Sequence, residues 1–284
     1  MAIGITSSAT QSGLVSNFNK FSDAKSTNLR KLSSGFRIGK ASDNAAGLAI
    51  AIRLNTESSA LSQASQNVSS GLSMLNTADG GLNQISDMLI RAKELAVQSA
   101  NGSLDDSTRQ AINTEFDSIT SEISRIASST EFSGQDLLAG DFSSGSSDQF
   151  DIQAGASNTS SDRINLNVIE GATSSQLGLD NIDVSTIGNA QNAIDAIDSA
   201  LDQVSTTMAN IGATQNRLSF ANANLSTSIV NLQSATSVIR DTDIAFESIS
   251  LAQNQIGQDA ALSAIKNANE GKKQLIGKLL NTKG

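Results

Sequence analysis

The sequence predicts a mainly α-helical protein, a long antiparallel helical rod or coiled coil formed by both halves of the chain, with a small β-hairpin region in the middle. Three observations support this fold class. The 284 residues contain no proline, so the strongest helix breaker is absent. Apolar residues recur every seven positions in both halves of the chain. Between the halves, the apolar period changes to two.

The first half contains one long apolar seam. Its positions are Leu61, Val68, Leu75, Leu82, Leu89 and Ala96, with companions at Ala64, Gly71, Ala78, Ile85 and Ala92. Small companions let a neighbouring helix approach closely, and we expect such a contact at Gly80-Gly81. We expect this helix to begin near the N-cap pair Ser42-Asp43 and to end at Asn101-Gly102.

Two further helices are expected. One follows Ser103, because Asp105 and Asp106 in a first turn suit the positive end of a helix dipole. Its seam is Ile112, Phe116, Ile119, Ile123 and Ile126, and it stops in the polar stretch 128–130. The other occupies the second half, where eight apolar positions seven residues apart run from Ala190 to Ile239. Its companion positions turn polar at Gln215 and Asn222.

The segment between these helices has the pattern of a β-hairpin. Its apolar residues alternate with polar ones, first at Phe150, Ile152 and Ala154 and then at Ile164, Leu166 and Val168. The connecting residues 155–163 are polar, as expected of a loop.

The two chain ends carry weaker amphipathic helices. Their seam residues, which we expect to carry self-assembly, are Leu14, Phe18, Phe21, Leu29, Leu32 and Phe36 at one end and Leu251, Leu262, Ile265, Ile276 and Leu279 at the other. Polar residues interrupt both seams, at Lys25, Asn28, Gln258, Asn269 and Lys272. A narrow, interrupted stripe buries too little area to offset the ordering entropy. We therefore expect these helices to order fully only against neighbouring chains.

Three domains follow from these patterns. Residues 1–40 with 245–284 form a terminal helical pair, and residues 41–140 with 186–244 form a central rod. Residues 141–185 form the hairpin and loops, which belong to the rod.

The composition excludes most enzyme chemistry. The chain contains no Cys and no His, so it lacks the commonest nucleophile–base pairs and transition-metal ligands. We expect no enzyme activity, no cofactor and no metal. Asp241 and Asp243, like Asp105 and Asp106, are expected to be solvated helix-end charges, because no regular cation-binding loop surrounds them. A net charge of −9 argues against nucleic acid, and no apolar run is long enough for membrane insertion.

Six separated motifs resemble bacterial flagellins, in the same order. They are LSSGFRI at 32–38, DNAAGLAIA at 43–51, ELAVQSANG at 94–102, TEFSGQDLLAG at 130–140, GATQNRL at 212–218 and IRDTDIAFE at 239–247. The hairpin region is also similar, whereas the large variable outer domains of many flagellins are missing. The first thirteen residues and the basic C-terminus differ from the usual flagellin ends.

The resemblance implies a structural subunit that polymerises into the bacterial flagellar filament and serves motility. Its implied partners are further copies of itself, a flagellar export chaperone, the filament cap and hook-junction proteins. Its implied location is the extracellular filament, reached without a cleaved signal peptide. The alternative is a flagellin-like hook–filament junction protein, and a coiled-coil adhesin or secreted effector is a more distant one.

The resemblance also implies recognition by an animal Toll-like receptor. Arg91, Leu95 and Glu115 match the surface that the receptor recognises in this family. An Arg and a Glu beside a Leu suit a charge-assisted contact. The alternative is a solvated helix face that also serves subunit packing.

Overall fold

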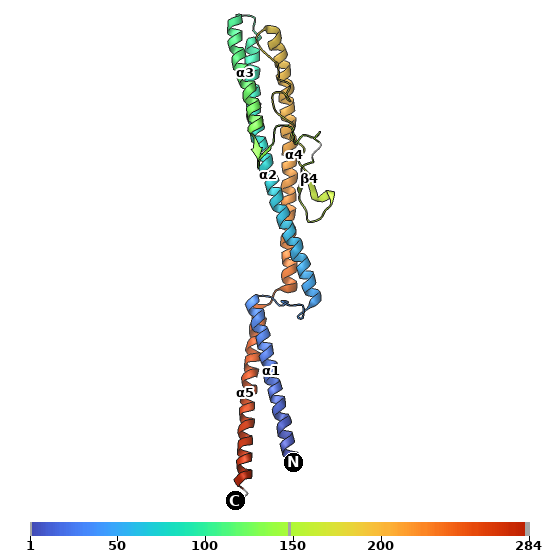
Figure 1. Cartoon of the computed structure of the whole chain (residues 1–284), viewed down its shortest axis with the longest axis vertical. Helices are drawn as coiled ribbons and strands as arrows, with labels where there is room; N and C mark the ends of the chain where they lie inside the picture. Colours follow the sequence, from blue (N-terminus) through green and yellow to red (C-terminus); the bar gives the residue numbers. More distant parts are fainter. Residues whose placement is uncertain (1, 147–148, 282–284) are drawn as a thin grey trace. The chain divides into compact units, whose positions relative to one another are not determined.

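The structure is a computed structural model that describes residues 2–146 and 149–281, with side chains described for 11–146, 149–274 and 276–277. Its elements are α1 (Ala2–Ser34), α2 (Ala45–Ser99), α3 (Asp106–Ser129), β1 (Glu131–Phe132), β2 (Gln135–Asp136), β3 (Asp151–Gln153), η1 (Ser160–Asp162), β4 (Arg163–Asn165), α4 (Ile187–Arg240) and α5 (Ile244–Asn281). The predicted fold class is confirmed: long helices dominate, and the strands form small antiparallel hairpins (Figure 1).

The chain divides into two compact units. Unit 1 comprises residues 1–56 and 232–284, and unit 2 comprises residues 57–231. The units divide within the long helices α2 and α4. The boundaries drawn from the sequence lie elsewhere: residue 40 falls in the linker between α1 and α2, and residue 245 falls at the start of α5.

Unit 2 is built around the predicted seams. Val68, Leu75, Leu82 and Leu89 of α2 are fully buried, as is Ile211 of α4. Phe116 and Ile123 place one face of α3 in the same core. Burial along α4 continues as far as Leu225, and the last two seam positions, Leu232 and Ile239, are only half-buried. The heptad pattern therefore located most of this core correctly.

The polar companion positions of α4 form hydrogen bonds to α2. Gln215 Nε2 donates to Asn76 Oδ1 at 3.0 Å, and Ser65 Oγ donates to Asn222 Oδ1 at 2.6 Å. The later residue of α4, Asn222, pairs with the earlier residue of α2, Ser65. The two helices are therefore antiparallel. Side-chain hydrogen bonds of this kind fix the register that an apolar seam leaves open.

The helix starts correct two expectations from the sequence. Asn44 caps α2, because its Oδ1 accepts from the Gly47 amide at 2.9 Å, whereas Ser42-Asp43 lies one step earlier. Asp105 caps α3, because its side chain accepts from the Thr108 amide at 2.9 Å; helix α3 begins after it and not after Ser103. A cap requires an extended residue whose side chain reaches back to the first turn, and composition alone does not fix that residue.

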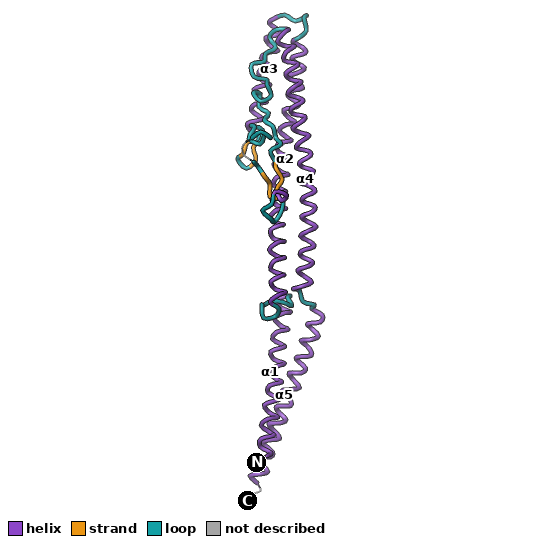
Figure 2. The backbone as a smooth tube through the Cα atoms, turned by 90° about the vertical axis from the view of Figure 1, so that its right-hand side faces the viewer, coloured by secondary structure: helices purple, strands orange, loops and turns teal. Residues whose placement is uncertain are grey.

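The predicted hairpin is present as strands β3 and β4. They pair antiparallel, with Ile152 opposite Ile164. A second hairpin, β1 with β2, was not expected: its turn residues Ser133 and Gly134 have φ of 55° and 80°, as a two-residue type I′ turn requires. Figure 2 shows both hairpins and their loops alongside the helices of unit 2.

Gly81 provides the close approach expected at the Gly-Gly pair. A Cβ at this position would lie 2.8 Å from Thr130 Oγ1 and 2.9 Å from Leu138 Cδ1, whereas Gly80 is open. The contact is therefore with the segment that follows α3, not with the body of a second helix.

Candidate functional site

Unit 1 consists mainly of two antiparallel helices, α1 and α5, which lie side by side (Figure 1). Gln11 Nε2 donates to Asn269 Oδ1 at 2.8 Å near one end of the pair. Lys31 Nζ lies 3.4 Å from Glu247 Oε1 near the other end, and the Glu247 side chain is buried. The two contacts fix both the direction and the register of the pair.

The polar interruptions of the terminal seams have hydrogen-bond partners across α1 and α5. Lys25 donates to Gln258 at 3.3 Å, and Lys272 donates to Gln11. Asn28 is 7% exposed; with its amide nitrogen turned toward Glu247, it donates to that carboxylate at 3.2 Å. Buried polar groups with partners specify one register, so these interruptions define the pair rather than weaken it.

Several predicted assembly residues are already partly buried within the single chain. Leu14, Phe18, Phe21, Leu32, Leu251 and Ile265 are half-buried, whereas Leu29, Leu262 and Ile276 are exposed. Leu279 lies outside the residues whose side chains are described. The half-buried group already packs partly within one chain, which leaves less of it for contacts with other copies.

Phe36 corrects the expectation that it belongs to the N-terminal helix. Helix α1 ends at Ser34, and Gly35 follows with a φ of 72°, the left-handed conformation that commonly ends helices. Phe36 then pairs with Asp241 as an isolated antiparallel bridge. The Arg240 guanidinium lies 3.9 Å from the Phe36 ring centroid, a cation–π contact.

Arg37 joins the same two linkers. Its backbone amide donates to the Arg240 carbonyl at 2.7 Å, and its guanidinium donates to the carbonyls of Ile239 at 2.7 Å and Val238 at 3.2 Å. A cation on the last carbonyls of a helix satisfies groups that have no intrahelical partner. The segments that leave α1 and α4 are thus held together within unit 1.

The outer face of α5 carries apolar residues that the predicted seam missed. Ala245, Ile249, Ala252 and Ile256 follow at spacings of four, three and four, so they share one helix face, and all four are exposed. The exposed fractions are 59% for Ile249 and 69% for Ile256. The 4-3-4 spacing was readable in the sequence, but two of its members are Ala, so the stronger Leu seam on the inner face concealed it.

Formal charge is unevenly divided between the units. Unit 1 contains 13 Lys and Arg against 7 Asp and Glu, a net charge of +6. Unit 2 contains 6 basic and 21 acidic residues, a net charge of −15. The total of −9 is therefore the sum of a basic terminal unit and a strongly acidic central unit. Two copies of unit 1 will repel each other electrostatically, and so will two copies of unit 2.

Arg91 and Glu115, two of the three predicted receptor residues, form an ion pair. The Nη2–Oε1 distance is 2.7 Å, both side chains are about half exposed, and Arg91 also donates to Glu94 at 3.0 Å. These hydrogen bonds, in which Arg91 donates to Glu115 first and to Glu94 second, raise the pKa of Arg91. Leu95 is 1% exposed, so it supports this surface from the core and does not present its own side chain.

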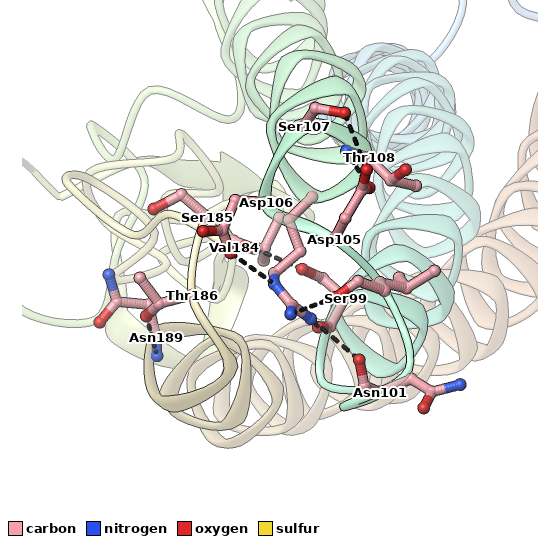
Figure 3. A network of polar contacts seen from close by, with 12 residues as sticks. Ser99, Asn101, Asp105, Asp106, Ser107, Thr108, Val184, Ser185, Thr186 and Asn189 are labelled. Atoms are coloured by element: carbon pink, nitrogen blue, oxygen red, sulfur yellow. Dashed lines mark hydrogen bonds and ion pairs between the residues drawn. The ribbon is translucent and has the colours of Figure 1, made fainter.

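A buried arginine that the sequence reasoning missed joins α2 to α3. Arg109 is 6% exposed, and its guanidinium donates to the carbonyls of Ser99 (2.9 Å), Asn101 (2.9 Å) and Leu104 (2.6 Å). Figure 3 shows the surrounding network, in which the Ser99 hydroxyl also donates to the Val184 carbonyl. The only sequence signal for this buried site was an Arg in the first turn of a helix that begins with acidic residues.

The described residues contain no group of three or more Asp or Glu side chains that could hold a metal ion. Asp243 has a different role from metal binding, since its Oδ1 accepts from the Phe246 amide at 3.1 Å and caps α5. No helix in the described part of the chain combines the length and apolarity that a membrane span needs.

Comparison with known proteins identifies the family. The model of the bacterial flagellin N-terminal helical region matches residues 5–143, and that of the C-terminal helical region matches residues 194–280. A flagellar filament 30.7 kDa core protein of Treponema maltophilum is 36% identical over 254 residues, covering 85% of this chain and 87% of that protein. A flagellin of Halalkalibacterium halodurans is 38% identical over 242 residues, with the same coverage.

Among solved structures, a putative flagellar hook-associated protein from Vibrio parahaemolyticus has a TM-score of 0.57 at 19% identity. The match covers 70% of this chain and 99% of that one, and it shows a shared fold. The family models and the filament proteins show more: this chain belongs to the bacterial flagellin family.

Proposed function

We propose that this structural protein polymerises into the bacterial flagellar filament, outside the cell, through the faces that the paired helices of unit 1 leave exposed. Relatives named as filament proteins match across most of their own length. The likeness to a hook-associated protein, at 19% identity, concerns the fold alone and does not favour a junction protein. The polymer formed in this way serves motility.

The outer face of α5 is the observation that carries the proposed contact. The inner face of α5 is occupied by α1, while Ile249 and Ile256 remain exposed on the other side. An apolar stripe that one chain cannot cover indicates a partner surface. A second copy offers the same stripe together with the exposed residues of α1, such as Val15 and Leu29. A contact between two different faces is heterologous, and one whose rotation does not close into a ring propagates into a helical polymer, as the filament function requires.

Truncation tests this function. Purified chain lacking residues 1–30 or 255–284 is incubated with seeds sheared from full-length filaments, and growth is followed by electron microscopy. Both truncations should fail to elongate seeds, because each removes one member of the α1·α5 pair. Circular dichroism should show that the helices of unit 2 remain folded. Normal polymerisation of both truncations contradicts the proposal.

Residues 1–40 with 245–284 then form the filament core, and residues 41–140 with 186–244 form the next shell, with 141–185 on that shell. The export chaperone binds the C-terminal helical segment before assembly, and the cap and hook-junction proteins contact the ends of the polymer. Catalysis has no part in this function.

Recognition by a Toll-like receptor, if it uses this face, depends on the Arg91–Glu115 ion pair. Both side chains are exposed in the single chain, whereas Leu95 supports them from below. Arg91→Ala should lower receptor signalling by the monomer, and Arg125→Ala, which removes a nearby exposed Arg–Glu pair on α3, serves as the control. Unchanged signalling with Arg91→Ala would exclude this face.

A further inference from the structure

Unit 2 has two adjoining hollows beside its hairpins. The first, of about 330 Å³, has mostly apolar walls and lies between α2 and the hairpins. Its lining residues include Ser70, Gly71, Met74, Phe132, Phe150 and Ile152. A cavity of about 150 Å³ accepts benzene, so this hollow has room for a phenyl ring. The second, of about 460 Å³, shares Gln135 and Phe150 with the first.

The second hollow is acidic. Asp136 and Asp141 line it, both are exposed, and neither has an ion pair among the residues that the structure describes. Asp136 also lies directly opposite Glu131 in the β1–β2 ladder. Like charges at such positions are unfavourable. A cation placed here would relieve that repulsion in a unit whose net charge is −15.

A complementary pair of side chains lies on α4 in the same unit. Phe220 is 76% exposed, and Arg217, three residues earlier, is exposed and has no ion pair within the described part of the chain. Residues three apart are neighbours on a helix surface. An exposed phenyl group beside an unpaired guanidinium matches an apolar hollow beside an acidic one.

Phe220 cannot reach the hollow of its own chain. A Cβ at Gly71, in the hollow wall, would lie 3.6 Å from Leu218 Cδ1, so Leu218 marks the side of α4 that faces α2 at the level of the hollow. Phe220 is two residues further along, about 200° around the helix, and points away from that side. The two features thus lie at a similar level of unit 2, on opposite sides.

We infer that Arg217 and Phe220 of one copy dock into the paired hollows of a neighbouring copy, with Phe220 in the apolar hollow and Arg217 at Asp136 and Asp141. The occupant is a second copy of this chain, chosen by charge complementarity between a basic projection and an acidic rim. Because projection and hollow are different surfaces on opposite sides of one unit, the contact is heterologous, and each copy can engage one neighbour through each surface. This inference rests on the proposed filament function and specifies one of its contacts.

Thiol cross-linking tests the contact, because the chain contains no native Cys. Filaments are grown from a double variant, Ser70→Cys with Phe220→Cys, and treated with a short bismaleimide. The contact predicts a ladder of oligomers on a denaturing gel. Each single variant should give dimers at most. The control, Ser70→Cys with Val230→Cys, places the second thiol at another exposed apolar position of α4 and should give no ladder.

Charge reversal tests the second half of the contact. Arg217→Glu, added to the double-cysteine variant, should lower the cross-linking yield by about tenfold, since an opposed like charge suppresses a contact. Asp136→Lys added to that chain should restore much of the yield. A yield unaffected by Arg217→Glu overturns the role assigned to Arg217.

The remaining outcomes separate this contact from the filament itself. Double-cysteine filaments that grow normally but show no ladder overturn the contact and leave the filament function intact. A ladder from Ser70→Cys with Ile256→Cys, and none with Phe220→Cys, would assign the hollow to α5 of a neighbour instead and also overturn it. If Phe220→Cys alone stops growth while the monomer keeps its helix content and Val230→Cys grows normally, Phe220 is required at a contact between copies, as inferred.

Discussion

The ring of Phe21 lies against Gly257 so closely that a Cβ at residue 257 would lie 2.6 Å from Phe21 Cε1. This position is where α1 and α5 approach each other through a glycine and an aromatic ring. The contact explains why a helix-weakening residue occupies the middle of α5. It also shows that the two chain ends pack against one another within a single chain.

Gly257→Ala should therefore destabilise unit 1. The added methyl group displaces the Phe21 ring, and overpacking of this kind costs about 1–3 kcal/mol. Gly271→Ala is the matched control on the same helix: the space around Gly271 is open, so alanine should stabilise it by roughly 0.5–1 kcal/mol. Hydrogen exchange of α1 and α5 amides measures both effects. Equal protection of these amides in the two variants would show that the close contact between Phe21 and Gly257 does not affect the stability of unit 1.

Arg109→Ala should destabilise unit 2 strongly. The substitution leaves the carbonyls of Ser99, Asn101 and Leu104 without their charged donor. The free energy of unfolding should fall by about 3 kcal/mol, because three hydrogen bonds from one guanidinium do not contribute additively. Arg109→Lys should recover only part of it, because a single ammonium cannot reproduce the planar fork. Urea unfolding followed by circular dichroism measures the difference. A variant as stable as the parent chain would contradict this role.

Acid should weaken the start of α3 through Asp105. Hydrogen bonds from Thr108, by its side chain and its amide, and from the Ser107 hydroxyl lower the pKa of Asp105 below 3.8. A depressed pKa in the fold means that the stabilisation is present above 3.8 and is lost as pH falls through the folded value. Asp105→Asn keeps a capping oxygen but does not titrate. The unfolding free energy of this variant should change less with pH than that of the parent chain below about pH 4. If the two unfolding free energies fall in parallel with pH, the role assigned to Asp105 is contradicted.

Salt should promote polymerisation. If unit 1 stacks on unit 1 in the filament core, net charges of +6 meet, and neighbouring units 2 each have a net charge of −15. Raising the ionic strength from about 10 to about 150 mM shortens the Debye length from ~30 to ~8 Å, which screens this repulsion. The critical concentration for seeded growth should therefore fall over this range. A critical concentration that rises with salt would contradict this expectation, because it would mean that attraction between opposite charges dominates the contacts between copies.

The heptad seams allowed most of the fold to be predicted, because buried Leu, Ile and Val at fixed spacing leave few alternatives. Val68 and Ile211 are buried as expected, and strands β3 and β4 pair as the alternation indicated. The β1–β2 hairpin was missed because its strands are two residues long, too short for a period. Only the Ser133-Gly134 turn signalled it.

The candidate surfaces were less predictable than the core. The sequence shows which residues are apolar, but not which side of α5 a partner covers, so Leu251 and Ile256 could not be told apart. Lys25 and Gln258 looked like interruptions because their pairing joins residues more than two hundred positions apart. The burial of Leu95 likewise depends on where α3 and α4 pack, which the residues around it do not reveal.

Seeded growth of a variant with Ile249→Ser and Ile256→Ser tests the central claim most directly. These changes remove the outer apolar face of α5 and leave its contacts with α1 in place. Val230→Ser, at an exposed apolar position of α4, is the control. The account predicts that the double variant keeps its helix content but does not extend wild-type seeds, while the control extends them at the normal rate. Wild-type growth of the double variant would contradict it.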